Sequence, residues 1–264
     1  MITSVHNSKI QLIRKLQTQA KYRREEQAFV VEGVRLAEEA LQGGWEAELV
    51  LFTDLLDERG KAILGGFTER GVPVEQVSET VMKAVSETET PQGILVVLRV
   101  RPLPIPVNPS FILILDGVRD PGNLGTILRT AAAAGVQAVL LGPGCVDALS
   151  PKVVRAGMGA HFRLPIQGLG WDGIECICKN PESTLQVYLA DSTAGVPYTQ
   201  VDMKSPLALI IGGEAAGAGF ESALLADEKV HIPMPGGSES LNAAVATSIL
   251  VFEVVRQRGI NKFN

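Results

Sequence analysis

Runs of apolar residues alternate with helical patterns through the second half of the chain. The runs at 111–115 (FILIL), 138–142 (AVLLG), 186–190 (QVYLA) and 207–211 (LALII) are apolar on both faces. Such strands are typical of a parallel sheet that helices cover on both sides. Helices are predicted at 124–134, 151–156 and 220–226, a short strand at 230–232, and a long apolar helix at 242–257. The pattern predicts an α/β fold.

The first half shows the same alternation on a smaller scale. Ile10, Ile13 and Leu16 recur at helical spacing, which predicts a helix over 8–24. Strands are predicted at 29–31 and 48–52, a helix between them, and a closing strand at 93–100. Residues 101–110 hold four prolines, which remove backbone donors and fix φ, so this segment is the best linker. We therefore expect a domain over 1–100, a linker over 101–110 and a domain over 111–264.

Composition, together with the positions of the histidines and cysteines, excludes several classes of protein and of site. No apolar run reaches membrane-spanning length, and the first ten residues lack the apolar region of a signal peptide. The three cysteines form no disulfide or metal pattern, which favours reduced thiols in a cytoplasmic protein. The three histidines stand far apart, so no metal site is expected.

The charge is unevenly distributed. The chain carries a net charge of −5, yet residues 1–24 contain six basic residues and no acidic one. A basic segment on an acidic body favours contact with an anion such as RNA phosphate. A solvated basic helix with no partner explains the same pattern equally well. The candidate RNA-binding residues are Lys9, Arg14, Lys15, Lys21, Arg23 and Arg24.

Three glycine-punctuated segments, each after an apolar run, are the candidate site. They lie at 115–135, 212–219 and 232–242. Pockets of open α/β sheets form outside the carboxyl ends of the strands, so the segments are predicted to form three walls of one pocket. No G-x-G-x-x-G follows a strand, and neither a P-loop nor a G-x-S-x-G elbow is present. A glycine-rich, largely uncharged pocket suits an adenine with a sugar.

The same segments resemble the three motifs of the SpoU/TrmH class of the SPOUT superfamily, the RNA ribose 2′-O-methyltransferases. The matching stretches are DPGNLGTILRTAAAAG, LIIGGEAAGAG and IPMPGGSESLNAAVATSILVFEV. The N-terminal half is similar to the domain that recruits the substrate in this class, through ITSVHNSKI, FVVEG and ETPQGIL. The resemblance implies a C-terminal trefoil knot, an N-terminal domain like ribosomal protein L30e, a homodimer and bound S-adenosylmethionine.

The resemblance also assigns roles to residues. It implies a catalytic set of Asn123, Arg129, Glu214, Ser240 and Asn242. It implies contacts to the methyl donor from Gly212, Gly213, Gly217, Ile232, Met234 and Leu241. A guanidinium is not a ready general base, so the arginine is expected to grip a phosphate beside the target ribose. The asparagines and the serine are equally typical of helix N-caps.

Two departures from the class lie in the second motif, where Gly213 replaces an asparagine and Ala215 replaces a glycine. The resulting expectation is methyl transfer to a ribose 2′-hydroxyl, most readily of 23S-type ribosomal RNA. Three alternatives stay open at this point: a transfer-RNA ribose methyltransferase, an enzyme that methylates a base, and a non-catalytic RNA-binding paralogue.

Overall fold

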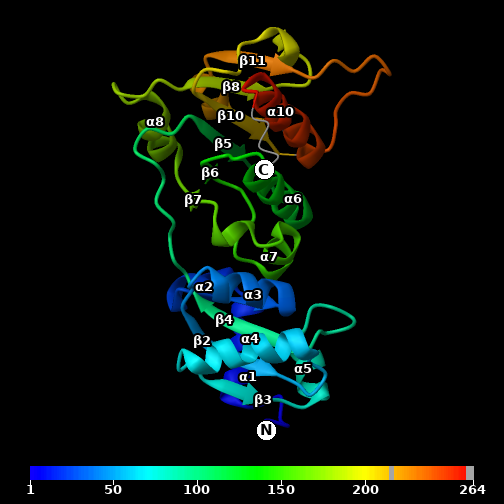
Figure 1. Cartoon of the computed structure of the whole chain (residues 1–264). Helices are drawn as coiled ribbons and strands as arrows, with labels where there is room; N and C mark the ends of the chain where they lie inside the picture. The colour runs from blue at the N-terminus through cyan, green and yellow to red at the C-terminus, as the bar shows by residue number, and fades with distance from the viewer. Residues whose placement is uncertain (214–216, 260–264) are drawn as a thin grey trace. The chain divides into compact units, whose positions relative to one another are not determined.

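The computed structural model describes residues 1–213 and 217–259, which form two compact units (Figure 1). Unit 1 comprises Met1–Arg101 and Asp147–Arg163, and unit 2 comprises Pro102–Val146 and Leu164–Asn264. The first boundary falls at the start of the proline-rich linker. The second differs from the sequence-based division, because a segment from the middle of the C-terminal half packs as part of unit 1.

Unit 1 is built on a mixed four-stranded sheet in the order β1-β4-β2-β3. The strands are β1 (Ala28–Glu32), β2 (Ala47–Phe52), β3 (Val74–Gln76) and β4 (Ile94–Arg99). The central β4 pairs antiparallel with β1 and β2, while β2 pairs parallel with β3. The helices are α1 (Ser8–Thr18), α2 (Ala20–Glu26), α3 (Val34–Gln42), α4 (Glu58–Glu69), α5 (Glu79–Val85), α7 (Pro151–Gly157) and the 3₁₀ turn η1 (Ala160–Phe162).

The helix predicted over 8–24 is broken in two. Gln19 adopts an extended backbone (φ −124°, ψ 107°) between α1 and α2. The guanidinium of Arg23 donates to the carbonyl oxygens of Leu16 and Gln17. These carbonyls lie in the last turn of α1, where no helical N–H is available to them. Arg23 therefore stabilises the end of α1. The predicted inner face of that helix is confirmed, since Ile10, Ile13 and Leu16 are fully buried.

Unit 2 is a seven-stranded sheet in which every pair of neighbours is parallel, in the order β7-β6-β5-β10-β8-β11-β9. The strands are β5 (Phe111–Asp116), β6 (Ala138–Leu141), β7 (Ile166–Gly168), β8 (Gln186–Ala190), β9 (Val196–Pro197), β10 (Leu207–Gly212) and β11 (Glu228–His231). The helices are α6 (Pro121–Ala133), α8 (Trp171–Lys179), α9 (Phe220–Leu225) and α10 (Ala243–Gln257), with the 3₁₀ turn η2 (Tyr198–Gln200). The predicted α/β fold with a parallel sheet is confirmed; β7, α8 and β9 were not predicted.

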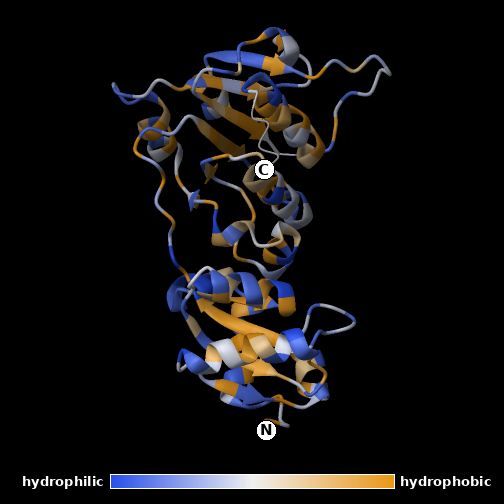
Figure 2. Cartoon of the chain, viewed as in Figure 1, coloured by the Kyte–Doolittle hydropathy of each residue, from blue (hydrophilic) through white to orange (hydrophobic). Residues whose placement is uncertain are grey.

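The core of unit 2 lies around its central strands. The side chains of β5 and β10 are buried on both faces, and Figure 2 shows these strands in hydrophobic colours. The two strands run in register and finish together, with Asp116 opposite Gly212. In the described part of the chain, no helix combines the length and apolarity that crossing a bilayer requires.

Candidate functional site at the carboxyl edge of the parallel sheet

The first two glycine-rich segments meet where β5 and β10 end. A Cβ atom placed on Gly213 would lie 2.2 Å from the carbonyl oxygen of Gly117, and one on Gly212 would lie 2.3 Å from the backbone nitrogen of Ala218. Real Cβ atoms do not approach that closely, so both positions require glycine. Gly217 has a φ of 65°, and its N–H donates to the carbonyl of Gly213, which closes the turn. Two of the three predicted walls therefore lie together.

A further wall at this edge comes from the loop after β6. The N–H of Val146 donates to the carbonyl of Val118 over 2.9 Å, and the thiol of Cys145 lies 3.2 Å from the carbonyl of Leu115. The sequence analysis missed this loop. Its signal was the G-P-G turn directly after a predicted strand, at 142–144.

Asp116, the last residue of β5, holds the end of the second glycine segment through two hydrogen bonds. Its Oδ2 accepts hydrogen bonds from the N–H of Gly219 over 2.6 Å and from the hydroxyl of Ser222 over 2.5 Å. Ser222 is fully buried in α9. Sequence reasoning missed Asp116, although an acidic residue at the end of an apolar strand was the available signal.

Asn242 joins α10 to α6. Its Oδ1 accepts from the N–H groups of Ala244 and Val245, so the predicted N-cap role is confirmed. Its Nδ2 donates to Oδ1 of Asn123 over 2.9 Å. Asn123 is not the cap of its own helix, since Asp120 accepts from the Asn123 N–H at 2.8 Å. The two asparagine side chains that the resemblance singled out thus lie in direct contact.

Arg129 lies six residues after Asn123 on α6. At about 100° per residue, these side chains leave the helix about 120° apart. Thr130, which follows Arg129, faces α10 with its hydroxyl 3.4 Å from that of Ser248. Arg129 itself is exposed and makes no hydrogen bond or ion pair within residues 1–213 and 217–259. Asn123 and Arg129 therefore leave α6 in different directions.

The third glycine segment, residues 232–242, stands apart from the other two. Figure 1 shows it as the long loop between β11 and α10, reaching out from the sheet. Ser240 is exposed, Leu241 is 37% exposed, and Ile232 and Met234 are half-buried. Ser240 does not cap α10. Among the described residues, Asn242 at the end of this segment is the member that hydrogen-bonds to another wall, at Asn123. Glu214 and Ala215 lie outside the described residues.

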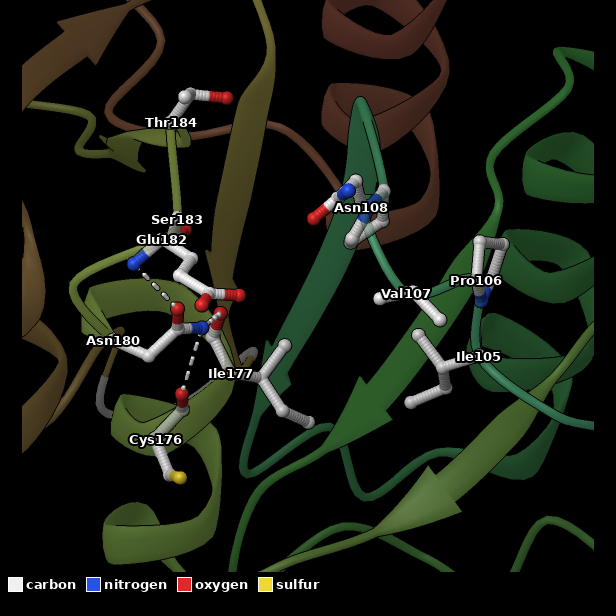
Figure 3. A pocket seen from close by; sticks show the side chains of 11 residues that line it. Ile105, Pro106, Val107, Asn108, Cys176, Ile177, Asn180, Glu182, Ser183 and Thr184 are labelled. Atoms are coloured by element: carbon white, nitrogen blue, oxygen red, sulfur yellow. Dashed lines mark hydrogen bonds between the residues drawn. The ribbon is translucent and has the colours of Figure 1, made fainter.

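A hollow of about 740 Å³ lies elsewhere on unit 2 (Figure 3). It is formed by the linker before β5 and by residues 180–184 before β8, at the amino edge of the sheet. Asn180 there donates to the carbonyls of Cys176 and Ile177 and accepts from the N–H of Glu182. Its amide thus terminates α8, and the hollow does not belong to the site at the carboxyl edge.

The chain matches the model of the SpoU rRNA Methylase family over residues 110–252, more than half of its length. It belongs to this family. Residues 7–96 of this SpoU family member match the MRM3-like substrate binding domain. No cluster of three or more His, Cys, Asp or Glu side chains suited to a metal occurs in the described ranges.

Relatives align along nearly the whole SpoU-family chain. It is 36% identical to the 23S rRNA (guanosine(2553)-2′-O)-methyltransferase RlmP of Bacillus subtilis, over 96% of this chain and 98% of that protein. It is 34% identical to human mitochondrial rRNA methyltransferase 3, over 89% of this chain and 69% of that protein. The AdoMet-bound rRNA methyltransferase of Sinorhizobium meliloti superposes with a TM-score of 0.87 at 33% identity, covering 97% of each chain.

The basic residues near the start of this SpoU family member are largely engaged within unit 1. Arg23 is 4% exposed, and its guanidinium contacts the Asp147 carboxylate through two nitrogens at 2.6 and 2.8 Å. It is a structural residue, which corrects its assignment to an RNA surface. Lys9 pairs with Glu75. The remaining members are Arg14, which donates to the Ala84 carbonyl, Lys15, which lies over the Tyr22 ring, Lys21, which pairs with Glu25, and the exposed Arg24.

Proposed function

We propose that this chain transfers the methyl group of S-adenosylmethionine to a ribose 2′-hydroxyl of RNA, with 23S-type ribosomal RNA as the substrate. The proposal rests on the Asn123–Asn242 contact and on the Gly212–Gly213 turn, which follow the carboxyl ends of the parallel strands. The chain also aligns over 96% of its length with an enzyme named for that reaction.

The turn fits the adenosyl part of the donor. Gly212, Gly213 and Gly217 offer backbone groups without side chains, which allows close approach to a flat, uncharged ligand. Ile232, Met234 and Leu241 belong to the outlying 232–242 loop, and we assign them to cover the donor when it is bound. When bound, S-adenosylmethionine supplies a sulfonium-activated methyl group.

The side chains orient the acceptor. Asn123 and Asn242 hold each other at the edge where the ribose would lie, and most of the rate gain is expected from alignment of the hydroxyl. Arg129 grips the neighbouring phosphate and offsets negative charge on the attacking oxygen. Ser240 joins them from the 232–242 loop. Glu214 takes part from its place directly after Gly213. Only RNA carries the 2′-hydroxyl, so DNA is excluded as a substrate.

A second copy of the chain completes the site. Val245 and Phe252 lie seven residues apart on α10, hence on one face, and are 49% and 48% exposed. An apolar stripe on a long helix favours burial in an interface. α10 packs on α6, the helix that carries the exposed Arg129, so a homodimer that covers this face would deliver Arg129 to the partner's asparagine pair.

Three further features belong to the proposal. Unit 1, a small mixed sheet with helices, is assigned as an L30e-like domain that selects the RNA, with the exposed Arg24, Lys15 and Lys21 among the residues that contact it. The chain returns through 232–242 and places α10 against α6. This passage is assigned as the one that closes a trefoil knot. Action on ribosomal RNA assigns the protein to the cytoplasm, where a bacterial cell makes that RNA.

Two measurements test the function. Calorimetry with S-adenosylmethionine should show binding; the absence of binding would favour a non-catalytic RNA-binding role. Methylated 23S-type and transfer RNA should then be digested to nucleosides and analysed by mass spectrometry. We expect 2′-O-methyl nucleosides from the ribosomal substrate. Methylated bases, or modification of transfer RNA alone, would contradict the proposal.

A further inference from the structure

The geometry points to Asp116 as a positioning residue that holds the two flanks of the donor-binding turn, Gly212 and Gly219, in place for the ligand. This inference rests on the proposed function, because it concerns how the same chain binds S-adenosylmethionine. Asp116 touches neither the donor nor the acceptor in this assignment. It acts through the backbone of the turn that follows β10.

Asp116 lies against both stems of the turn. Its backbone lies opposite Gly212 in the strand register, and its carbonyl oxygen would be 3.3 Å from a Cβ on Gly213. Its carboxylate accepts from the N–H of Gly219 at the far stem. One residue therefore ties the beginning and the end of a segment that otherwise consists of alanines, glycines and one glutamate.

The hydrogen bonds of Asp116 are stronger than bonds between neutral groups. A carboxylate that accepts from a backbone N–H and a buried hydroxyl forms charge-assisted bonds, which are about twice as strong as neutral ones. Ser222 has no solvent exposure, so its hydroxyl depends on Asp116 for a partner. The bond also fixes α9, whose first residue follows Gly219 directly.

A turn that is held in place before binding loses less conformational entropy when the ligand binds. Glycine turns lose more conformational freedom than other segments when a ligand orders them. A turn already held by Asp116 has lost part of that freedom before binding, so less affinity is lost on ordering. Removal of the carboxylate should therefore weaken donor binding and leave the chemical step largely intact once the donor is saturating.

The chain offers a matched control in Asp227. Its Oδ2 also accepts from a backbone N–H, that of Val187 at 2.8 Å, and from a side chain, that of Lys179 at 2.6 Å. It belongs to the same sheet but lies at the amino edge, just before β11 begins. Asp227→Asn should lower stability without any change in the donor KM.

The experiment compares Asp116→Ala, Asp116→Asn, Ser222→Ala and Asp227→Asn with the wild-type protein. For Asp116→Ala we expect a donor KM raised about tenfold or more, the equivalent of one charge-assisted hydrogen bond. kcat at saturating donor and the KM for RNA should stay within about threefold. Asp116→Asn, which keeps an acceptor, should recover part of the affinity, and Ser222→Ala should raise the donor KM by a smaller factor than Asp116→Ala.

Hydrogen exchange keeps the test valid if Asp116→Ala does not fold. In Asp116→Asn and Ser222→Ala without donor, exchange at the Gly219 and Ser222 amides should be faster than in wild type, and in Asp227→Asn unchanged. Wild-type donor KM in a folded Asp116→Ala, or an equal rise in Asp227→Asn, would overturn the inference. Failure of the wild-type protein to bind the donor would instead overturn the proposed function.

Discussion

The side-chain amide of Asn242 donates to the side-chain oxygen of Asn123 over 2.9 Å, while its own oxygen caps α10. The two roles use different atoms of one amide. Asn242 therefore couples the start of the last helix to the edge where the ribose is proposed to bind.

Asn242→Asp should separate these roles. The aspartate keeps an oxygen for the cap and is well suited to a helix N-terminus, so the free energy of unfolding should change by less than about 0.5 kcal/mol. The donor to Asn123 is lost, so methyl transfer should fall about tenfold or more. Asn242→Ala should lose activity and also about 1 kcal/mol of stability. Urea unfolding and single-turnover methylation measure both, and normal turnover in Asn242→Asp would contradict the orienting role.

Arg129→Ala should nearly abolish turnover while donor affinity stays close to wild type. The side chain is exposed and unpaired among the described residues, so the free energy of unfolding should shift by less than about 0.5 kcal/mol. Arg129→Lys keeps the charge but not the planar fork, and should recover only a minor part of the rate. Mixed dimers of Arg129→Ala and Asn123→Ala chains, which carry one intact composite site, should regain activity if Arg129 acts on its partner.

Phe252→Glu should convert the proposed dimer to a monomer. A charge on the exposed apolar face of α10 opposes burial against a second copy, yet costs the isolated chain little because the ring is already half exposed. Phe220→Glu is the matched control, since Phe220 on α9 is 73% exposed and lies outside the proposed interface. Light scattering after size exclusion gives the masses. If the Phe252→Glu variant remained a dimer, this face of α10 would be excluded as the dimer interface.

Arg23 and Arg24, neighbours on α2, should respond in opposite ways. Arg23→Ala removes a buried guanidinium from Asp147 and from the end of α1, and should cost about 3 kcal/mol of stability. Arg24→Ala should leave stability unchanged and weaken RNA binding, more at low salt than at high salt. Thermal unfolding measures the stability of both variants, and filter binding at two salt concentrations measures their affinity for RNA. Weaker RNA binding by a stable Arg23→Ala would restore Arg23 to the RNA surface.

His161 should make the protein lose stability in mild acid. Its ring is buried, its Nε2 lies 2.8 Å from the Ala148 carbonyl, and burial lowers its pKa to about 4. The unfolded chain takes up this proton near pH 6.5, whereas the folded chain does so only near pH 4. The stability from the neutral ring is therefore complete above pH 6.5 and is lost as the pH falls toward 4, by up to ~1.4 kcal/mol per pH unit.

His161→Gln should remove that part of the pH dependence, because an amide can still donate to Ala148 but does not titrate. Urea unfolding at pH 7.5, 6 and 5 gives the free energy of unfolding of the variant and of the wild type. In the difference between the two, the contributions of all other titrating groups cancel. An equal slope for both proteins would show that folding does not lower the pKa of His161.

The sequence predicted features that local pattern and chemistry control. Continuous apolar runs identified β5 and β10, and the Asn242 position identified the start of α10. The burial of Arg23 could not be predicted from local pattern, because it depends on Asp147, 124 residues further along the chain. α8 was missed because Gly170 and Gly173 weaken its helical pattern, and only tertiary burial of Ile174 and Cys178 fixes it.

The candidate site was predicted in its residues more than in its geometry. The meeting of the Gly117 and Gly213 backbones follows from parallel strands that end in register, which the apolar runs implied. The angle of about 120° between Asn123 and Arg129 follows from their spacing on α6. The outward course of 232–241 and the packing of α10 on α6 depend on tertiary contacts, which no local pattern encodes.

The lack of any side chain at Gly213 has a consequence for engineering. Gly213 directly follows β10, and a Cβ there would lie 2.2 Å from the carbonyl oxygen of Gly117 just beyond β5, so a methyl group would push the ends of these two neighbouring strands apart. Attempts to accept bulkier sulfonium analogues should hold this residue fixed. Diversity belongs in 235–239, whose residues are exposed and carry no role in the proposed site.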